Sequence, residues 1–159
     1  MKVGLWHFAA LGVVVTAAAW IGASGWWAGR SAIVLRTDDA QLVAQGQRID
    51  MAHCASCHGV RLEGQPDWRR RDAQGQLPAP PHDASGHTWH HADELLFKLT
   101  KYGVAKVVGT PGYASTMPAY EGILSDTEIV AVLSWIKSQW PPDIRAKHDA
   151  MNRASRSSP

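Results

Sequence analysis

The sequence predicts an all-α domain of three to four short helices, preceded by one apolar N-terminal helix. Apolar residues recur at helical spacing in three segments, whereas the alternation expected of a strand is not seen above chance. The chain has 159 residues, enough for one domain with short extensions but not for two full domains. We therefore expect an N-terminal segment at 1–30, a helical domain at 38–142, and a basic, disordered tail at 143–159.

The first helix of the domain is predicted from Asp38 to His53. Asp38 or Thr37 can cap its start, because a short side chain with an oxygen atom accepts hydrogen bonds from the free N–H groups of the first turn. The residues that form its partly apolar face are Leu42, Val43, Ile49 and Ala52.

A second helix is predicted from about Ala92 to Tyr102. Asp93 and Glu94 lie in its first turn, where the helix dipole favours negative charge, and Gly103 is a natural stop. The residues expected on its buried face are Leu95, Leu96, Leu99 and Tyr102.

The last helix of the domain has the clearest start signal in the chain. Ser125 and Glu128 form a capping box before an apolar run, and Trp140-Pro141-Pro142 ends the helix. Between the helices, Gly59–Pro81 and Val104–Tyr120 are predicted loops rich in Gly and Pro. Loops of this length inside a compact domain usually wrap around something.

The first thirty residues are predicted to take the chain to a membrane. Val3–Gly29 contains no charged residue, and Lys2 precedes it. As a helix, this segment is long enough to cross the ~30 Å hydrocarbon core of a bilayer. Tryptophans that would suit the outer membrane interface are Trp20, Trp26 and Trp27. We expect an uncleaved anchor, with a cleaved secretory signal as the alternative; in both cases the rest of the chain is exported.

The strongest chemical signal is the stretch from His53 to Gly59, which reads His-Cys-Ala-Ser-Cys-His-Gly. Two thiols at this spacing can form thioether bonds to the two vinyl groups of one haem, and the adjacent His58 can give the iron a nitrogen ligand. A zinc site would need two further ligands at set spacing, and a redox dithiol would need a βαβ context. Neither is seen, so one covalent haem c is expected at Cys54 and Cys57.

Met117 is the predicted second ligand of the haem iron. Of the four methionines, Met1 lies in the N-terminal segment, Met151 lies in the tail, and Met51 lies one turn before Cys54 on the same side. Met117 lies on a loop before the last helix, and a soft thioether suits low-spin haem iron. The alternative is a core methionine that fills a gap.

Over about residues 38–140 the sequence resembles the class I cytochromes c. The likeness rests on a helix that leads into Cys54–Gly59, a loop at Met117–Tyr120, and a final helix that begins near Leu124 and contains Ser134–Lys137. The stretch from Pro66 to Asp93 resembles a bacterial branch of small, often membrane-tethered cytochromes.

The resemblance implies an all-α fold around one covalent haem, with His58 and the predicted methionine as axial ligands. It also implies that the first and last helices cross near Gly46 and Trp135. A proline carbonyl would accept a hydrogen bond from His58, which would fix the imidazole and raise its basicity. Pro80 is the best candidate for that proline, and Pro81 is the second.

Two positions depart from the family pattern. Asp50 stands where the family usually has an aromatic residue, so we expect altered packing at the helix crossing. His82 stands where the family usually has Leu, and is expected to open one haem edge to water or to place an extra base there.

Two polar clusters allow more than one interpretation. Arg69–Arg71 with Trp68 either contacts the haem propionates or forms a solvated turn. The histidines of the middle stretch match no known metal-ligand spacing and are expected mainly on a solvated loop, with a copper or zinc site or a bis-histidine haem as alternatives. These are His82, His87, His90 and His91.

The expected function is one-electron transfer at the outer face of the bacterial inner membrane, with membrane-embedded redox proteins as partners. No enzyme activity is expected, because a six-coordinate iron has no open position for a substrate. One alternative is a haem-bearing subunit of a dehydrogenase or terminal oxidase, and another is a soluble periplasmic carrier after signal cleavage. A peroxidase or sensor is disfavoured because no distal His–Arg pair is seen. A net charge of +2 is too small to indicate nucleic acid.

Overall fold

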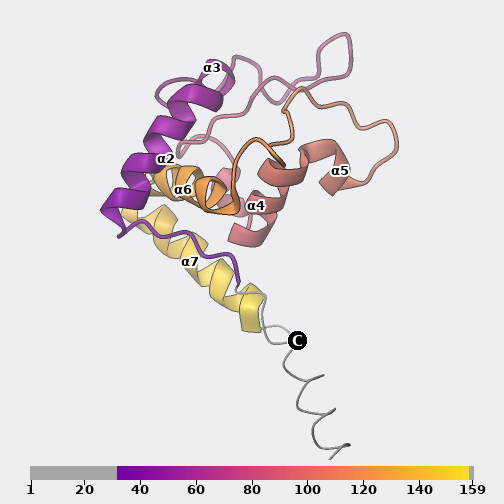
Figure 1. Ribbon diagram of the computed structural model, residues 1–159. Coiled ribbons are helices and arrows are strands. Elements are labelled where there is room, and N and C mark those ends of the chain that lie inside the picture. The colour runs from indigo at the N-terminus through magenta and orange to yellow at the C-terminus, as the bar shows by residue number, and fades with distance from the viewer. Residues whose placement is uncertain (1–31, 158–159) are drawn as a thin grey trace, which may run out of the picture. The chain divides into compact units, whose positions relative to one another are not determined.

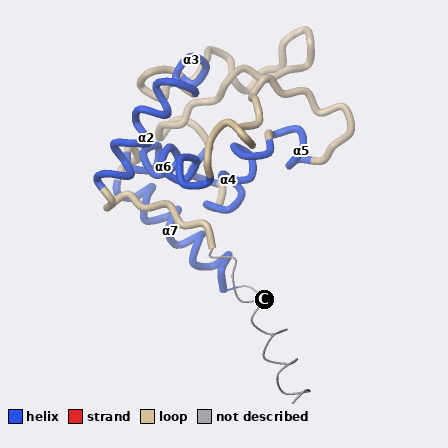
Figure 2. Tube along the Cα trace, in the orientation of Figure 1, coloured by secondary structure: helices blue, strands red, loops and turns tan. Residues whose placement is uncertain are grey.

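The computed structural model describes residues 32–157, which form helices joined by loops with no strand among them (Figures 1 and 2). The helices are α2 (Ala40–His53), α3 (Ala55–His58), the 3₁₀ helix η1 (Thr88–His90), α4 (Asp93–Tyr102), α5 (Val104–Val108), α6 (Asp126–Ser138) and α7 (Pro142–Ser157). The all-α prediction is confirmed for this part of the chain. The predicted anchor at 1–30 lies outside the described residues, and no helix within 32–157 is long and apolar enough to span a bilayer.

The centre of the fold is the crossing of α2 and α6 (Figure 1). Gly46 of α2 makes this crossing close, because a Cβ at that position would overlap the carbonyl oxygen of Ala131 and crowd Cβ of Trp135. Only glycine lets the two backbones approach so closely. The crossing near Gly46 and Trp135 that the family resemblance implies is therefore present.

The helix starts follow the capping chemistry of the sequence, with one shift. α2 begins at Ala40, and the side chain of Asp39 accepts a hydrogen bond from the N–H of Leu42 at 3.0 Å. The predicted caps were Thr37 and Asp38, and the observed cap is the next residue, Asp39. α6 has the predicted capping box, in which Ser125 and Glu128 exchange hydrogen bonds.

α4 has the predicted length, but the residues of its buried face differ from the prediction. Leu96 is buried as expected, whereas Leu95 is 37 % exposed and Leu99 is half-buried. Leu95 and Leu99 line a cavity, as Leu96 and Thr100 also do, and the other buried residues of the helix are Asp93 and Phe97. After Gly103 the predicted loop begins with the short helix α5.

The segment after residue 142 is helical, so the predicted disordered tail is wrong up to Ser157. Pro142 is the first residue of α7, a position that proline tolerates because its missing N–H would have no helical partner. The helix packs against η1 and the start of α4 through two buried polar side chains, His148 and Asn152. The Asn152 side-chain oxygen accepts a hydrogen bond from the N–H of Asp93 at 2.8 Å. Specific polar contacts of this kind give no hydropathy signal.

Candidate functional site

A cavity of about 580 Å³ lies beside α3, α4 and α6, and is walled by the loops that join them. This volume is in the range of cofactor pockets, and the wall is mostly apolar. Apolar wall residues include Leu77, Leu95, Leu96, Leu99, Val104, Val132, Leu133 and Ile136. The side chains that the sequence predicts to hold a haem all line this cavity: Cys54, Cys57, His58 and Met117.

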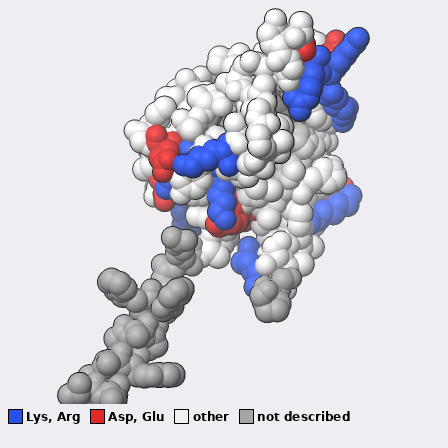
Figure 3. Space-filling model, turned by 90° about the vertical axis from the view of Figure 1, so that its right-hand side faces the viewer, with Lys and Arg blue, Asp and Glu red and all other residues white. Residues whose placement is uncertain are grey.

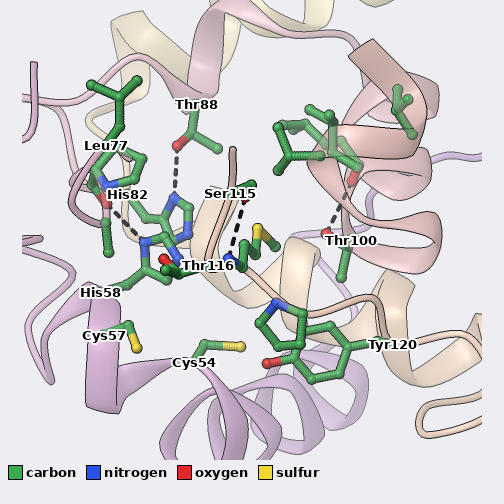
Figure 4. Close-up of a pocket in the computed structure, with 18 of the residues that line it drawn as sticks. Cys54, Cys57, His58, Leu77, His82, Thr88, Thr100, Ser115, Thr116 and Tyr120 are labelled. Atoms are coloured by element: carbon green, nitrogen blue, oxygen red, sulfur yellow. Dashed lines mark hydrogen bonds between the residues drawn. The ribbon is translucent and has the colours of Figure 1, made fainter. Parts of the chain in front are cut away.

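The two cysteines lie at the junction of α2 and α3. α2 ends at His53 and α3 begins at Ala55, so Cys54 connects the two helices and Cys57 lies one turn further on. Figure 4 shows both sulfur atoms on the same side of His58. Both thiols are free, and Cys57 is exposed. The spacing and orientation fit two bonds to one flat group.

At Cys54 the thiol lacks the lowered pKa of a reactive cysteine, and the described part of the chain offers no set of zinc ligands around the pair. Burial, with a smaller contribution from the nearby Asp50, raises the pKa of the Cys54 thiol to about 12. A reactive thiol needs a lowered pKa, because the thiolate is the nucleophile. Among residues 32–157 no three or more His, Cys, Asp or Glu side chains are arranged to hold a metal ion. The zinc alternative therefore lacks its ligands in this part of the chain.

His58 has one ring nitrogen that is free to bind a metal. Its ring is buried, and Nδ1 lies 2.8 Å from the carbonyl oxygen of Pro80, the contact that the resemblance implies. An Nδ1–H that donates to this oxygen leaves Nε2 with a free lone pair. Burial lowers the pKa of His58, although the Pro80 carbonyl acts in the opposite direction. The ring is therefore kept in the neutral form that binds a metal.

The Pro80 carbonyl is held in place by close backbone packing around glycine. Gly64 has a φ of +69°, and a Cβ there would overlap the backbone nitrogen of Pro81 and crowd the carbonyl carbon of Pro80. A residue at position 64 must adopt a left-handed conformation and let the backbone of Pro80 and Pro81 approach closely, and only glycine does both without strain. This packing holds the two ends of the long loop together, and the N–H of Gly64 joins them to α3 by donating to the carbonyl of His58 at 2.7 Å.

His82 lines the cavity and lies beside His58, so it places an extra base next to the predicted iron ligand, and an opening of the haem edge to water stays a prediction. Its ring lies flat against the His58 ring, with centroids 3.9 Å apart and an angle of 19° between the planes (Figure 4). His82 Nδ1 is 2.8 Å from Oγ1 of Thr88, and the His82 carbonyl accepts a hydrogen bond from the Trp140 indole at 2.7 Å. Burial lowers the pKa of His82 well below its ordinary value, so this ring is also neutral.

Met117 reaches the cavity from a loop that is tied to two helices. The N–H of Tyr120 donates to the carbonyl of Thr100 in α4 at 3.1 Å. The Tyr120 hydroxyl donates to the carbonyl of His53 at the end of α2 at 2.7 Å. Met117 itself is half-buried, and its N–H donates to Oγ of Ser115. The hydrogen bond from Tyr120 to α2 has no signal in the sequence.

The basic segment Arg69–Arg71 lies outside the cavity wall and is connected to it by aromatic rings. The Arg69 guanidinium lies 4.1 Å from the centre of the Trp68 ring, and Trp68 stacks on His87, which lines the cavity. The Arg71 guanidinium lies 5.4 Å from the Tyr113 ring, which also lines the cavity. Contact between these arginines and haem propionates stays a prediction.

The residues present fit the group that the sequence predicts. Two thiols at the haem spacing, a neutral imidazole with one free nitrogen, and a thioether share one mostly apolar cavity. The family model for cytochrome c matches residues 43–140, a range that contains the whole cavity wall and ends before α7. No curated protein and no solved structure matches the chain.

Proposed function

Because the chain belongs to the cytochrome c family, we propose that it is a class I, mono-haem carrier of single electrons with His58 and Met117 as axial ligands. Membership of this family means that the protein holds covalent haem c and takes part in haem-based electron transfer. The thioether bonds are made by Cys54 and Cys57, whose spacing fits this attachment. The haem supplies an iron couple that gains and loses one electron.

The observation that supports this proposal most directly is how the two predicted ligand side chains, His58 and Met117, are held at the cavity. The Pro80 carbonyl engages Nδ1 of His58 and leaves Nε2 free, so that this nitrogen would bind the iron. Met117 lines the same cavity, on a loop that Tyr120 fastens to α2 and α4. The apolar wall excludes water from around the iron, which is one of the means by which a protein sets a reduction potential.

A carrier is proposed rather than an enzyme because His58 and Met117 would hold both axial positions of the iron. With His58 and Met117 bound, no position on the iron is open to a substrate. The second candidate is a haem-bearing subunit of a larger dehydrogenase or oxidase, in which the same site would pass electrons within one complex. The sequence feature that favours this candidate is the apolar segment at 1–30, which would also suit assembly with membrane subunits.

We further propose that the haem domain works at the outer face of a bacterial inner membrane, held by residues 1–30. The support is the uncharged stretch Val3–Gly29. Its partners would be redox proteins in the same membrane. On the face drawn in Figure 3, Lys and Arg side chains form small separate groups between areas without charge. Docking on such a face would depend on uncharged contacts as well as on charge.

The ligand assignment is tested by replacing Met117 with Ala. We expect the weak sulfur-to-iron band at the red end of the oxidised spectrum to disappear. The reduction potential should fall, since axial ligation is one determinant within a range of about 0.8 V. The matched control is Met51→Ala, because Met51 is 54 % exposed and does not line the cavity. If the Met117 variant keeps both the band and the potential, the second ligand lies elsewhere.

A further inference from the structure

His82 is held in place by hydrogen bonds to both its backbone and its ring. Its N–H donates to the carbonyl of Leu62 at 2.8 Å, and its own carbonyl accepts from the Trp140 indole at 2.7 Å. Its ring nitrogen Nδ1 is 2.8 Å from Oγ1 of Thr88, a side chain that is only 5 % exposed. Backbone and ring are therefore both fixed, from three different segments of the chain.

The fixed ring of His82 covers one face of His58. The two planes are 19° from parallel and their centroids are 3.9 Å apart, which leaves no room for a side chain between them. The Pro80 carbonyl holds the Nδ1 edge of the same His58 ring. The Pro80 carbonyl thus restrains one edge of the His58 imidazole, and the His82 ring blocks rotation of that imidazole toward one face.

We propose that His82 is a positioning residue, which, anchored by Thr88, sets the rotation of the His58 ring about its bond to the haem iron. The inference rests on the proposed role of His58 as an axial ligand. A leucine at this position has no nitrogen for Thr88 to hold and no flat face to lay against an imidazole. Together with the orientation of the methionine ligand, the direction of the imidazole plane determines which iron orbital holds the unpaired electron of the oxidised state. It therefore determines how spin spreads over the haem edge.

The experiment uses the full-length holoprotein with two single substitutions, His82→Leu and Thr88→Val. Leu removes the stacked ring but keeps an apolar side chain. Val keeps the shape of Thr88 while removing its hydroxyl, which contacts Nδ1 of His82 and also lies 3.5 Å from the Pro81 carbonyl oxygen. The readout is the proton NMR spectrum of the oxidised protein, in which the order and spread of the haem-methyl signals report the imidazole plane. We expect both variants to change this pattern in the same sense, and Thr88→Val to change it less.

The matched control is His90→Leu, since His90 is exposed, stacks on Trp89 and does not line the cavity. It should keep the wild-type pattern. Wild-type haem-methyl signals in either His82→Leu or Thr88→Val overturn the proposal, and Thr88→Val keeps it testable if the leucine variant does not mature. Strongly shifted His58 ring signals in the wild-type spectrum test ligation separately. Their absence would overturn the axial role of His58, and with it this inference.

Discussion

Asp50 is a buried carboxyl group of α2, one turn after Gly46. Its side chain is 0 % exposed, and neither oxygen has a hydrogen-bond partner within residues 32–157. It lies in α2, one turn before Cys54, where the family usually has an aromatic residue. Burial raises its pKa to about 6, because a charge without partners is costly away from water.

This raised pKa predicts that Asp50→Asn stabilises the protein at neutral pH. The native state favours the protonated acid, so its contribution to stability is fully present below pH 3.8 and is lost as pH rises through about 6. We expect the Asn variant to gain up to about 3 kcal/mol in free energy of unfolding at pH 8 and little at pH 4. Urea unfolding at the two pH values measures the difference.

Asp38→Asn is the matched control for this experiment, because Asp38 is exposed. It should have the same small effect at both pH values. An Asp50→Asn variant whose stability relative to the wild type does not change between pH 4 and pH 8 would show that Asp50 does not titrate in this range.

The donor side chains of the site were predictable because they lie in short, local patterns. The cysteine motif and its adjacent His58 span a few residues, and Met117, which was selected by elimination among four methionines, lines the same cavity. The contacts around His82 were not predictable. Thr88 is six residues away and Trp140 is 58 residues away, and nothing in the sequence joins them before the chain folds.

α7 is an element whose attachment to the domain depends on a neutral histidine. His148 Nε2 lies 3.0 Å from the His91 carbonyl oxygen and 3.6 Å from the Asp93 carboxylate. The longer distance is not a hydrogen bond. Burial, and next the Lys137 ammonium, lower the pKa of His148 and outweigh the opposite effect of Asp93 and of Asp149. The helix is therefore docked by the uncharged ring.

Acid is expected to release α7 from the domain. Because the pKa of His148 is lower in the folded state than its ordinary value of 6.5, the neutral ring stabilises the folded state. This contribution is fully present above pH 6.5 and is lost as pH falls through the lowered pKa. Hydrogen exchange corrected for the intrinsic pH dependence should show α7 amides losing protection between pH 7.5 and pH 5.5, while α4 amides keep theirs. His148→Leu should remove this pH dependence. Equal protection of α7 at both pH values in the wild type would contradict the expectation.

Sequence patterns predicted α4 and α6, which have capping residues and apolar periodicity, better than α7, which is held by buried polar side chains. The capping box at Ser125 gave the start of α6, and Gly103 gave the end of α4. α7 was missed because its buried positions are His148 and Asn152, which hydropathy treats as surface residues. The short helix α5 was missed because its neighbouring glycines favour a loop interpretation.

At the scale of the whole molecule, the start of the described chain is fixed to the haem domain. The N–H of Leu35 donates to the Asp93 carboxylate at 3.1 Å, and the N–H of Arg36 donates to Oγ of Ser134 at 3.0 Å. If residues 1–30 form an anchor, the free tether is only the few residues before Leu35, roughly 20 Å or less when extended. The haem would then stay close to the membrane surface.

This arrangement predicts that the full-length protein sediments with membranes and resists extraction by high salt, since apolar burial rather than charge would hold it. A chain that begins at Ser31 behind a cleavable signal should be soluble, with an unchanged haem spectrum. Recovery of the native protein from the soluble periplasmic fraction, with an N-terminus near Trp20 or Trp26, would contradict the anchor.

The same preparation distinguishes a carrier from a subunit. After detergent extraction, a free carrier should purify alone, and a single peak by size-exclusion chromatography with light scattering should give the mass of one chain plus detergent. Co-purification of other redox subunits in fixed ratio would favour the second candidate function instead.

The indole of Trp140 has a practical consequence for anyone who prepares the protein. Its ring lies edge-on to His148 of α7, with centroids 5.0 Å apart, while its N–H holds the backbone of His82. A chain cut back to the matched family range ends at Trp140, and the cut removes the helix that covers this side chain. Such a shortened protein would contain all the residues proposed to hold the haem, yet its terminal indole would be open to water. Its spectra would then be a poor guide to those of the intact chain.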